Sequence, residues 1–131
     1  MARYVLDTHA IVLAFVAPKK LGRRARAVLS RVERGKDEAL LPAAALAEVA
    51  LLADLGWIRI SLPQIRVALD ETPALQFLPL ELRQLDIFST LSVLRDPFDR
   101  LIVSAARAEN ARLLSRDEEL STTGLVDVVW S

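Results

Sequence analysis

The stretch RYVLDTHAIVLAFV, residues 3–16, decides the architecture of this chain. Its first four residues form a short run of β-favouring side chains, which predicts a buried strand over residues 3–6. Asp7 and Thr8 follow at once, and both residue types favour the N-cap of a helix. Residues 11–16 are then continuously apolar and predict a helix. The sequence therefore predicts a strand that passes directly into a helix at Asp7.

The same alternation of strands and helices continues to the end of the chain. Further strands are predicted over residues 39–41, 75–78, 112–114 and 126–130, and further helices over residues 21–35, 43–55, 62–71, 81–94 and 97–110. Such alternation implies right-handed crossovers and a mainly parallel sheet that is covered on both faces. No linker, repeat or low-complexity segment divides the sequence. We therefore expect an α/β fold in which residues 1–131 form a single three-layer α/β/α domain around a five-stranded sheet.

The composition limits what this domain can be. Hydrophobic residues make up 53% of the 131, and the mean hydropathy of +0.31 leads us to expect a partner that covers part of the apolar surface. No apolar run approaches the roughly 20 residues that span a bilayer, so no membrane segment is expected. The absence of cysteine excludes disulfides and cysteine-ligated zinc. Because the first residues, MARYVLDTH, contain an aspartate where a secretory signal must be apolar, we expect a cytoplasmic protein.

Charge is balanced overall but unevenly distributed along the chain. Seventeen basic and 17 acidic residues give a formal net charge of +0, so the whole molecule exerts no general attraction on nucleic acid. Residues 19–36, however, carry eight basic side chains and a single acid, Glu33, which gives this segment a net charge of +7. Contact with an RNA backbone explains this pattern, and so does the solvated face of a helix. The sequence leaves both interpretations open.

Four acids that are far apart in the sequence are candidates for one metal site. Asp7 and Asp117 follow predicted strands, and open parallel sheets bind ligands beyond the carboxyl ends of their strands. Glu48 lies in the helix after the second strand, and Asp99 lies at the start of the helix before the fourth. Four converging carboxylates would repel one another and require a cation, and oxygen ligands favour Mg²⁺ or Mn²⁺ over Zn²⁺. These four acids are therefore the candidate catalytic and metal-ligating residues.

Each acid also has a purely structural interpretation. Asp7 and Asp117 suit helix N-caps, and in the run DPFD, Asp96 suits an N-cap that is followed by proline at N1 and Asp99 near N3. Glu48 is a lone charge in an apolar helix, which a buried ion pair with arginine would explain. Any one acid taken alone is better explained by capping or pairing. Only the joint placement of the four acids favours a site.

The segments around these acids resemble the motifs of PIN domains, and more closely those of VapC toxins from toxin–antitoxin pairs. The segments are YVLDTHAIV with Asp7, LAEVALL with Glu48, RDPFDRLIVSAA with Asp99 and LLSRDEEL with Asp117. DPFDR is the most specific of these motifs, and the resemblance covers essentially the whole chain. Close relatives often have Trp before the second acid and His before RDPFDR, where this chain has Ala47 and Leu94. These departures leave the acids intact but bear on the details of substrate and partner.

The resemblance implies a metal-dependent endoribonuclease that hydrolyses RNA phosphodiester bonds, acting as the toxin of a toxin–antitoxin pair. It implies Mg²⁺, with Mn²⁺ as an alternative, as the cofactor, RNA as the substrate, a cognate antitoxin as the partner and a homodimer as the assembly. Ser115 occupies the position where such domains often have a Thr or Ser that supports the last acid. Weaker candidates for supporting the acids or the substrate are Thr8, Ser115, Arg100 and Asp96. Arg116 flanks an acid as Arg100 does, and His9, the only histidine, is assigned a supporting or packing role.

Three other functions compete with this one. A two-component receiver domain also gathers acids beside Mg²⁺ in a small parallel α/β fold, but it requires a lysine late in the chain, and lysine occurs here only at positions 19, 20 and 36. A nucleotide-binding module requires a glycine-rich phosphate loop, whereas the four glycines of this chain are isolated. The serious alternative is a catalytically silent PIN-like module that binds or scaffolds. Retention of all four acids argues against it.

Overall fold

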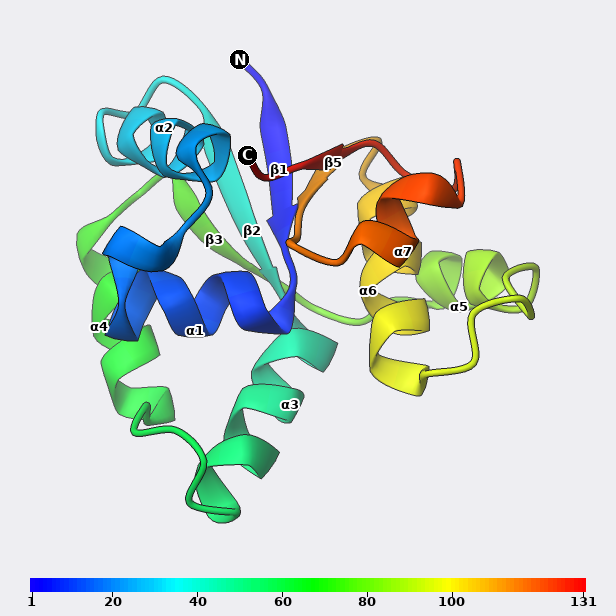
Figure 1. Ribbon diagram of the computed structural model, residues 1–131, viewed down its shortest axis with the longest axis horizontal. Helices are drawn as coiled ribbons and strands as arrows, with labels where there is room; N and C mark the ends of the chain where they lie inside the picture. The colour runs from blue at the N-terminus through cyan, green and yellow to red at the C-terminus, as the bar shows by residue number, and fades with distance from the viewer.

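The computed structural model describes residues 1–131, and a sheet of five parallel strands lies at its centre (Figure 1). The strand order is β3-β2-β1-β4-β5, and every neighbouring pair is parallel. The strands are β1 (Arg3–Leu6), β2 (Glu38–Pro42), β3 (Leu75–Leu78), β4 (Arg112–Leu114) and β5 (Val128–Val129). The predicted α/β class and the five strands are confirmed, and the sheet is wholly rather than mainly parallel.

Helices connect and cover the strands. They are α1 (Thr8–Val16), the 3-10 turn η1 (Pro18–Lys20), α2 (Arg23–Glu33), α3 (Ala43–Asp54), α4 (Leu62–Glu71), α5 (Leu82–Phe88), α6 (Pro97–Ala108) and α7 (Glu118–Thr122). Three or more consecutive residues of β1 and β2 are buried although their side chains alternate between the two faces, so both faces of the sheet are covered. None of these helices is both long and apolar enough to cross a membrane.

The central strand β1 is where the sheet reverses its direction of growth. From β1 the chain adds β2 and then β3 on one side, and afterwards crosses over to place β4 and β5 on the other side. Val5 of β1 is therefore paired with Leu40 of β2 and with Leu113 of β4. In open parallel sheets the crevice beyond the carboxyl ends of the strands at such a reversal is the usual ligand site. The topology places that crevice between the ends of β1 and β4.

The sequence-based boundaries fail at a few places. The helix predicted over 81–94 ends at Phe88, because the hydroxyls of Ser89 and Thr90 donate hydrogen bonds to the carbonyls of Asp86 and Ile87 and the chain turns away. The strand predicted over 126–130 is paired only at its centre, as β5. The five-residue helix α7 was not predicted as an element, since it is too short for an apolar period to be read.

Candidate active site

A polar cavity of about 380 Å³ lies at this reversal point, and none of its lining residues is hydrophobic. The lining residues are Asp7, Thr8, His9, Glu48, Asp96, Asp99, Arg116 and Asp117. The loops after β1 and β4 and the helices α1, α3 and α6 all contribute to it. The structure thus brings the four predicted acids together in one cavity, although they are spread over most of the sequence.

Asp7 is fixed at the junction between β1 and α1. Its backbone N–H donates to the Leu114 carbonyl oxygen (3.1 Å), and its Oδ1 accepts a hydrogen bond from the Ala10 N–H (2.8 Å), which makes it the N-cap of α1. Burial raises the pKa of Asp7 above its ordinary value, and the Ser115 side chain and the Ala10 N–H oppose that rise by favouring the charged form. Asp7 is therefore a carboxylate that is held rigidly and only partly compensated.

Asp117 is fixed in the same way at the end of β4. Its Oδ1 accepts hydrogen bonds from the N–H groups of Glu119 (2.9 Å) and Leu120 (3.3 Å), so it is the N-cap of α7. Its own N–H donates to Oγ of the buried Ser115 (3.0 Å). In both Asp7 and Asp117 the cap uses Oδ1 alone. Capping and metal ligation are therefore compatible roles for these acids, not exclusive ones.

The pKa of Asp99, like that of Asp7, is raised in the cavity. The Asp99 N–H donates to Oδ1 of Asp96 (2.9 Å), which places Asp96 at the N-cap of α6 and Asp99 in its first turn, as the DPFD run predicts. The pKa of Asp99 is raised to about 6, first by burial and then by the negative charges of Asp96, Asp117, Glu48 and Asp7. The carboxylates are thus close enough to disfavour one another's ionisation.

Glu48 enters the cavity from α3, which packs on both α1 and α6. The buried ion pair with arginine that would explain this lone charge is not present, because the five salt bridges of the chain involve other acids. A partly buried carboxylate that lacks a cation within the protein is costly to maintain unless a ligand compensates it. The structural interpretation of Glu48 therefore loses its main support.

Thr8 contributes the only buried side-chain polar atom that has no hydrogen-bond partner. Its Oγ1 is unpaired, the residue is 2% exposed, and it lines the acidic cavity. Leaving such a hydroxyl unsatisfied costs about 1–3 kcal/mol, so a water molecule or a ligand in the cavity is expected to pair it. His9, in contrast, is exposed at the rim of the same cavity and is not packed into the core.

The two arginines that flank the acids in sequence differ in the structure. Arg100 turns away from the cavity: its Nε and Nη2 donate to the Phe88 carbonyl oxygen (2.8 and 2.6 Å), and its guanidinium lies 4.0 Å from the centre of the Phe88 ring. It ties α6 to the end of α5. Arg116 is exposed, lines the cavity and forms no ion pair. The sequence signal for Arg116 was its place beside Asp117 in the loop after β4.

The donor set of the cavity fits a hard divalent cation. In their present orientations no three acidic or histidine side chains are arranged to hold a metal ion. The chemistry of the donors is nevertheless that of a magnesium site, since the lining offers carboxylate oxygens, one unpaired hydroxyl and no sulfur. Mg²⁺ keeps several water molecules and takes only one or two carboxylates directly. A cavity of about 380 Å³ with separated carboxylates suits such a hydrated ion.

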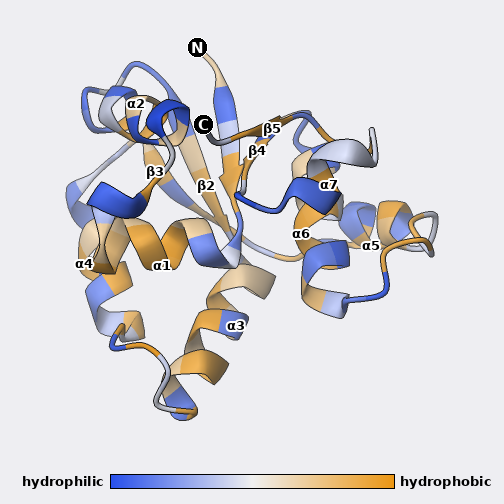
Figure 2. Cartoon of the chain, in the orientation of Figure 1, coloured by the Kyte–Doolittle hydropathy of each residue, from blue (hydrophilic) through white to orange (hydrophobic).

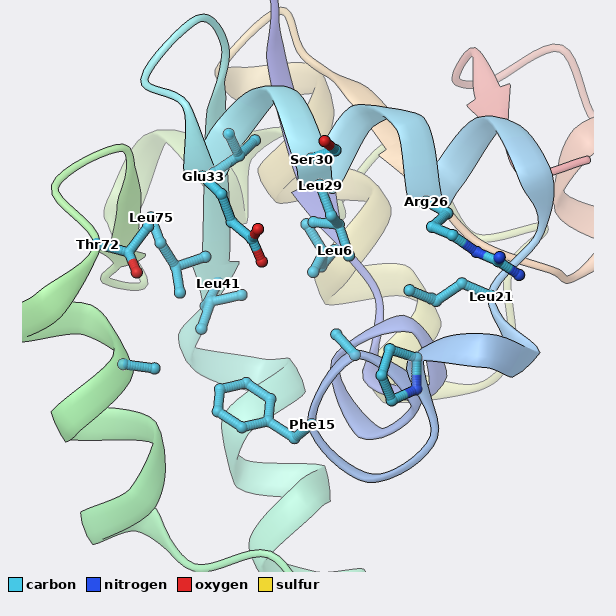
Figure 3. A pocket seen from close by; sticks show the side chains of 14 residues that line it. Leu6, Phe15, Leu21, Arg26, Leu29, Ser30, Glu33, Leu41, Thr72 and Leu75 are labelled. Carbon is cyan, nitrogen blue, oxygen red and sulfur yellow. The ribbon is translucent and has the colours of Figure 1, made fainter.

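A second hollow, of about 310 Å³, is apolar and lies under α2 (Figure 3). Leu6, Leu41 and Phe15 form part of its floor, while Arg26 and Glu33 project from α2 at its edge. It contains no grouping of acids, nucleophiles or histidine. The acidic cavity is therefore the candidate active site.

The PIN domain family model matches residues 4–125, and the chain belongs to the PIN domain family. The fold is also that of VapBC2 from Rickettsia felis bound to a DNA fragment from its promoter, with 18% identity, a TM-score of 0.71, and coverage of 98% of this chain and 99% of that one. Two further solved structures share this fold. One is a toxin–antitoxin complex from Klebsiella pneumoniae, with 16% identity, a TM-score of 0.66, and coverage of 96% of this chain and 95% of that one. The other is DNA-bound VapBC from Salmonella typhimurium, with 14% identity, a TM-score of 0.65, and coverage of 98% of each chain. No curated protein matches the chain.

Proposed function

We propose that this chain, acting as one domain in the cytoplasm, is a metal-dependent endoribonuclease of the VapC type and the toxin of a toxin–antitoxin pair. The observation that carries the proposal is the convergence of Asp7, Glu48, Asp99 and Asp117 in one cavity at the reversal point of the sheet. The family supports it, since PIN domains are generally nucleases. The raised pKa of Asp99 supports it as well, because clustered carboxylates at this position require a cation.

Mg²⁺, or Mn²⁺ in its place, is the proposed cofactor, and the four acids are its proposed ligands. When bound, such an ion lowers the pKa of a coordinated water and neutralises charge on the phosphate and the leaving oxygen. In the hydrolysis that results, the oxygen of water bonds to phosphorus and the 3′ oxygen leaves with a proton. The products carry 3′-hydroxyl and 5′-phosphate ends.

The protein's own contribution is to hold the reacting groups in place. Asp7 and Asp117 are fixed by their caps, and Ser115, which directly follows β4, contacts both, so neither carboxylate has to be ordered during the reaction. Thr8 offers an unpaired hydroxyl to the bound ligand. The N-terminus of α1 faces the cavity, and its partial positive charge favours an anionic phosphate. Arg116 adds a full positive charge at the rim.

Cleavage of a structured RNA by purified protein tests this function. We expect cleavage with Mg²⁺, its loss in EDTA, and its loss in Asp7→Asn and Asp99→Asn. Activity that survives chelation, or that survives both substitutions, rejects the proposal and points to another chemistry or a contaminant. RNA binding without cleavage at any concentration of Mg²⁺ or Mn²⁺ favours the catalytically silent PIN-like module instead.

We also propose that an antitoxin binds the apolar groove between α3 and α4. The groove has a volume of about 470 Å³, and eight of its nine lining residues are hydrophobic: Ala43, Leu46, Ala47, Ala50, Leu62, Ile65, Leu69 and Phe77, with Arg66 at the edge. Leu55 and Trp57, which follow α3, are 62% and 73% exposed, and Figure 2 shows much of α3 as apolar. An amphipathic helix laid in such a groove buries the exposed apolar area.

The solved complexes that share this fold contain an antitoxin, which supports the same kind of partner here. An arginine from that partner would reach the acidic cavity and form a charge-assisted pair there, which blocks metal or RNA. The same excess of exposed apolar residues supports a homodimer. Light scattering over a dilution series, with and without the product of any adjacent small gene, tests both assemblies. A protein that stays monomeric and ignores that product rejects the assembly proposal but not the nuclease.

A further inference from the structure

The segment from Lys19 to Lys36 carries a concentration of positive charge that the acidic cavity does not use. Of its eight basic side chains, only Arg31 forms an ion pair, with Nε 2.6 Å from Oδ2 of Asp37. The other seven are exposed and have no carboxylate partner: Lys19, Lys20, Arg23, Arg24, Arg26, Arg34 and Lys36. Glu33 is the single acid of this segment, so its exposed charge is overwhelmingly positive, whereas a solvated helical face ordinarily carries charges of both signs in similar number.

Four exposed basic residues lie where η1 is followed by the first turn of α2, and we call them the basic surface: Lys19, Lys20, Arg23 and Arg26. Nη2 of Arg26 donates to the Lys19 carbonyl oxygen (3.0 Å) and so fastens the first turn of α2 to η1. Arg23 and Arg26 are three residues apart and therefore neighbours on the helix surface. Figure 3 shows the Arg26 side chain extending along the edge of α2 beside Leu21. The hydrogen bond from Arg26 therefore keeps η1 beside the first turn of α2, and with them the backbone positions of the four basic residues.

Helix α1 connects the basic surface to the acidic cavity. The helix begins at its N-cap Asp7, inside the cavity, and ends just before η1, where the basic surface starts (Figure 1). Nine helical residues span about 14 Å at 1.5 Å each. That length corresponds to roughly four phosphates at the 3.4 Å spacing of a duplex strand. A nucleic acid strand that leaves the cavity along α1 therefore reaches the basic surface within a few nucleotides.

The charge of the cavity favours a separate anchoring surface for the substrate. Five carboxylates line the cavity against one arginine, so it repels a polyanionic substrate until a cation is bound. Affinity for a nucleic acid backbone comes mainly from lysine and arginine contacts to phosphate. We propose that the basic surface binds the sugar–phosphate backbone of the RNA strand whose scissile phosphate lies in the acidic cavity. This inference rests on the proposed nuclease function, and it names a second RNA-binding site outside the reacting centre.

The test measures RNA binding without cleavage. In an Asp99→Asn background, the dissociation constant for a structured RNA is measured at several salt concentrations for the parent, for Lys19→Gln/Lys20→Gln/Arg23→Gln, and for a control with the same loss of charge elsewhere, Arg34→Gln/Arg59→Gln/Arg112→Gln. All six positions are exposed and unpaired, and thermal melting checks that each variant is folded. We expect binding at low salt to weaken about tenfold or more in the basic-surface variant. Its salt slope should fall by about 2, at roughly 0.7 per lost phosphate contact.

The control should bind RNA within about twofold of the parent. Equal weakening in both variants overturns the inference, because only net charge then matters, and so does unchanged binding in the basic-surface variant. A basic-surface variant that keeps its RNA affinity but loses a protein partner assigns the surface to that protein and also overturns it. If the basic surface governs RNA binding while the chain with all four acids never cleaves RNA, the assignment of the basic surface as an RNA-binding site stands, whereas the nuclease proposal and the scissile phosphate in the cavity are rejected.

Discussion

The acidic cavity and the apolar groove are both lined by α3, yet the cavity carries uncompensated charge and the groove carries exposed apolar surface. Glu48 points from α3 into a cavity with no hydrophobic lining residue, while Leu46 and Ala50 of the same helix line a groove that is almost wholly apolar. The cavity holds carboxylates that repel one another, so a cation would compensate its charge. The groove exposes apolar side chains to water, so binding another apolar surface would bury them and lower the free energy.

This contrast gives each region its own dependence on conditions. Charge in the cavity responds to pH, metal and salt, because its energy comes from carboxylates. Burial in the groove depends mainly on apolar area and only weakly on those variables. Substitutions in one region should therefore leave the function of the other nearly intact. The following predictions test that independence.

The largest effect is expected in the cavity, on cleavage. Asp99→Asn should lower kcat/KM by at least about 100-fold, because the proposed role of Asp99 as a metal ligand would contribute several kcal/mol of charge stabilisation. Asp96→Asn, which retains an N-cap side chain, should lower it by no more than about fivefold. RNA cleavage assays at saturating Mg²⁺ compare the two. Equal losses in the two variants would show that cleavage depends on the structure of the first turn of α6 and not on metal binding by Asp99.

The next effect is expected in the groove, on partner binding. Phe77 lies on the edge strand β3, is 50% exposed and lines the groove, so Phe77→Asp should weaken the antitoxin complex about tenfold or more. Val93→Asp is the matched control, because Val93 is 72% exposed and lies outside the groove. Titration calorimetry with the antitoxin measures both. RNA cleavage by free Phe77→Asp should match that of the unmodified chain, and a large loss there would break the separation between the regions.

A smaller effect is expected on stability. The pKa of Asp99 is about 6 in the fold, against about 3.9 when unfolded, so the folded chain binds the extra proton between these values. Without metal, the free energy of unfolding should therefore fall as pH rises from about 4 to about 6 and stay low above that. Because Asp99 is only half-buried, the fall is on the order of 1 kcal/mol.

Denaturant unfolding in EDTA at pH 4.5 and 7.5 measures this contribution, and Asp99→Asn is its control. The asparagine variant should be no less stable than the unmodified chain at pH 7.5 in EDTA, and it should gain less from added Mg²⁺. A variant much less stable in EDTA would favour a structural role for the Asp99 carboxylate in α6 over a role in metal binding.

The smallest effect is expected at the rim of the cavity. Arg116→Ala should raise KM for RNA about threefold to fivefold with little change in kcat, because an exposed cation contributes modestly to binding phosphate. Arg100→Ala should act differently, since it removes the bonds to Phe88 and loosens α6 from α5. Steady-state kinetics and thermal melting distinguish the two. An Arg116→Ala variant with a much lower melting temperature and an unchanged KM would show that Arg116 has a structural role and does not bind RNA.

The local chemistry of this protein was predictable from its sequence. The run from Arg3 to Leu6 predicts β1, and Asp7 predicts the cap that follows it, because these signals act over a few residues. The DPFD run predicts the start of α6 correctly down to the N-cap, for the same reason. The motifs around the four acids predicted the family. The regular alternation of predicted strands and helices along the chain predicted the parallel sheet.

Only the tertiary structure decided which polar groups share a cavity and which do not. Arg100 and Arg116 have equivalent places beside acids in sequence, but the early end of α5 at Phe88 provides the carbonyl that draws Arg100 away. The unpaired hydroxyl of Thr8 and the absence of an ion pair at Glu48 depend on the packing of α1, α3 and α6 against one another. The hydrogen bond that joins η1 to α2 spans only seven residues, yet no motif in the sequence indicated it. Caps and strands follow from neighbours in the chain, whereas burial and electrostatic coupling arise only when distant segments meet.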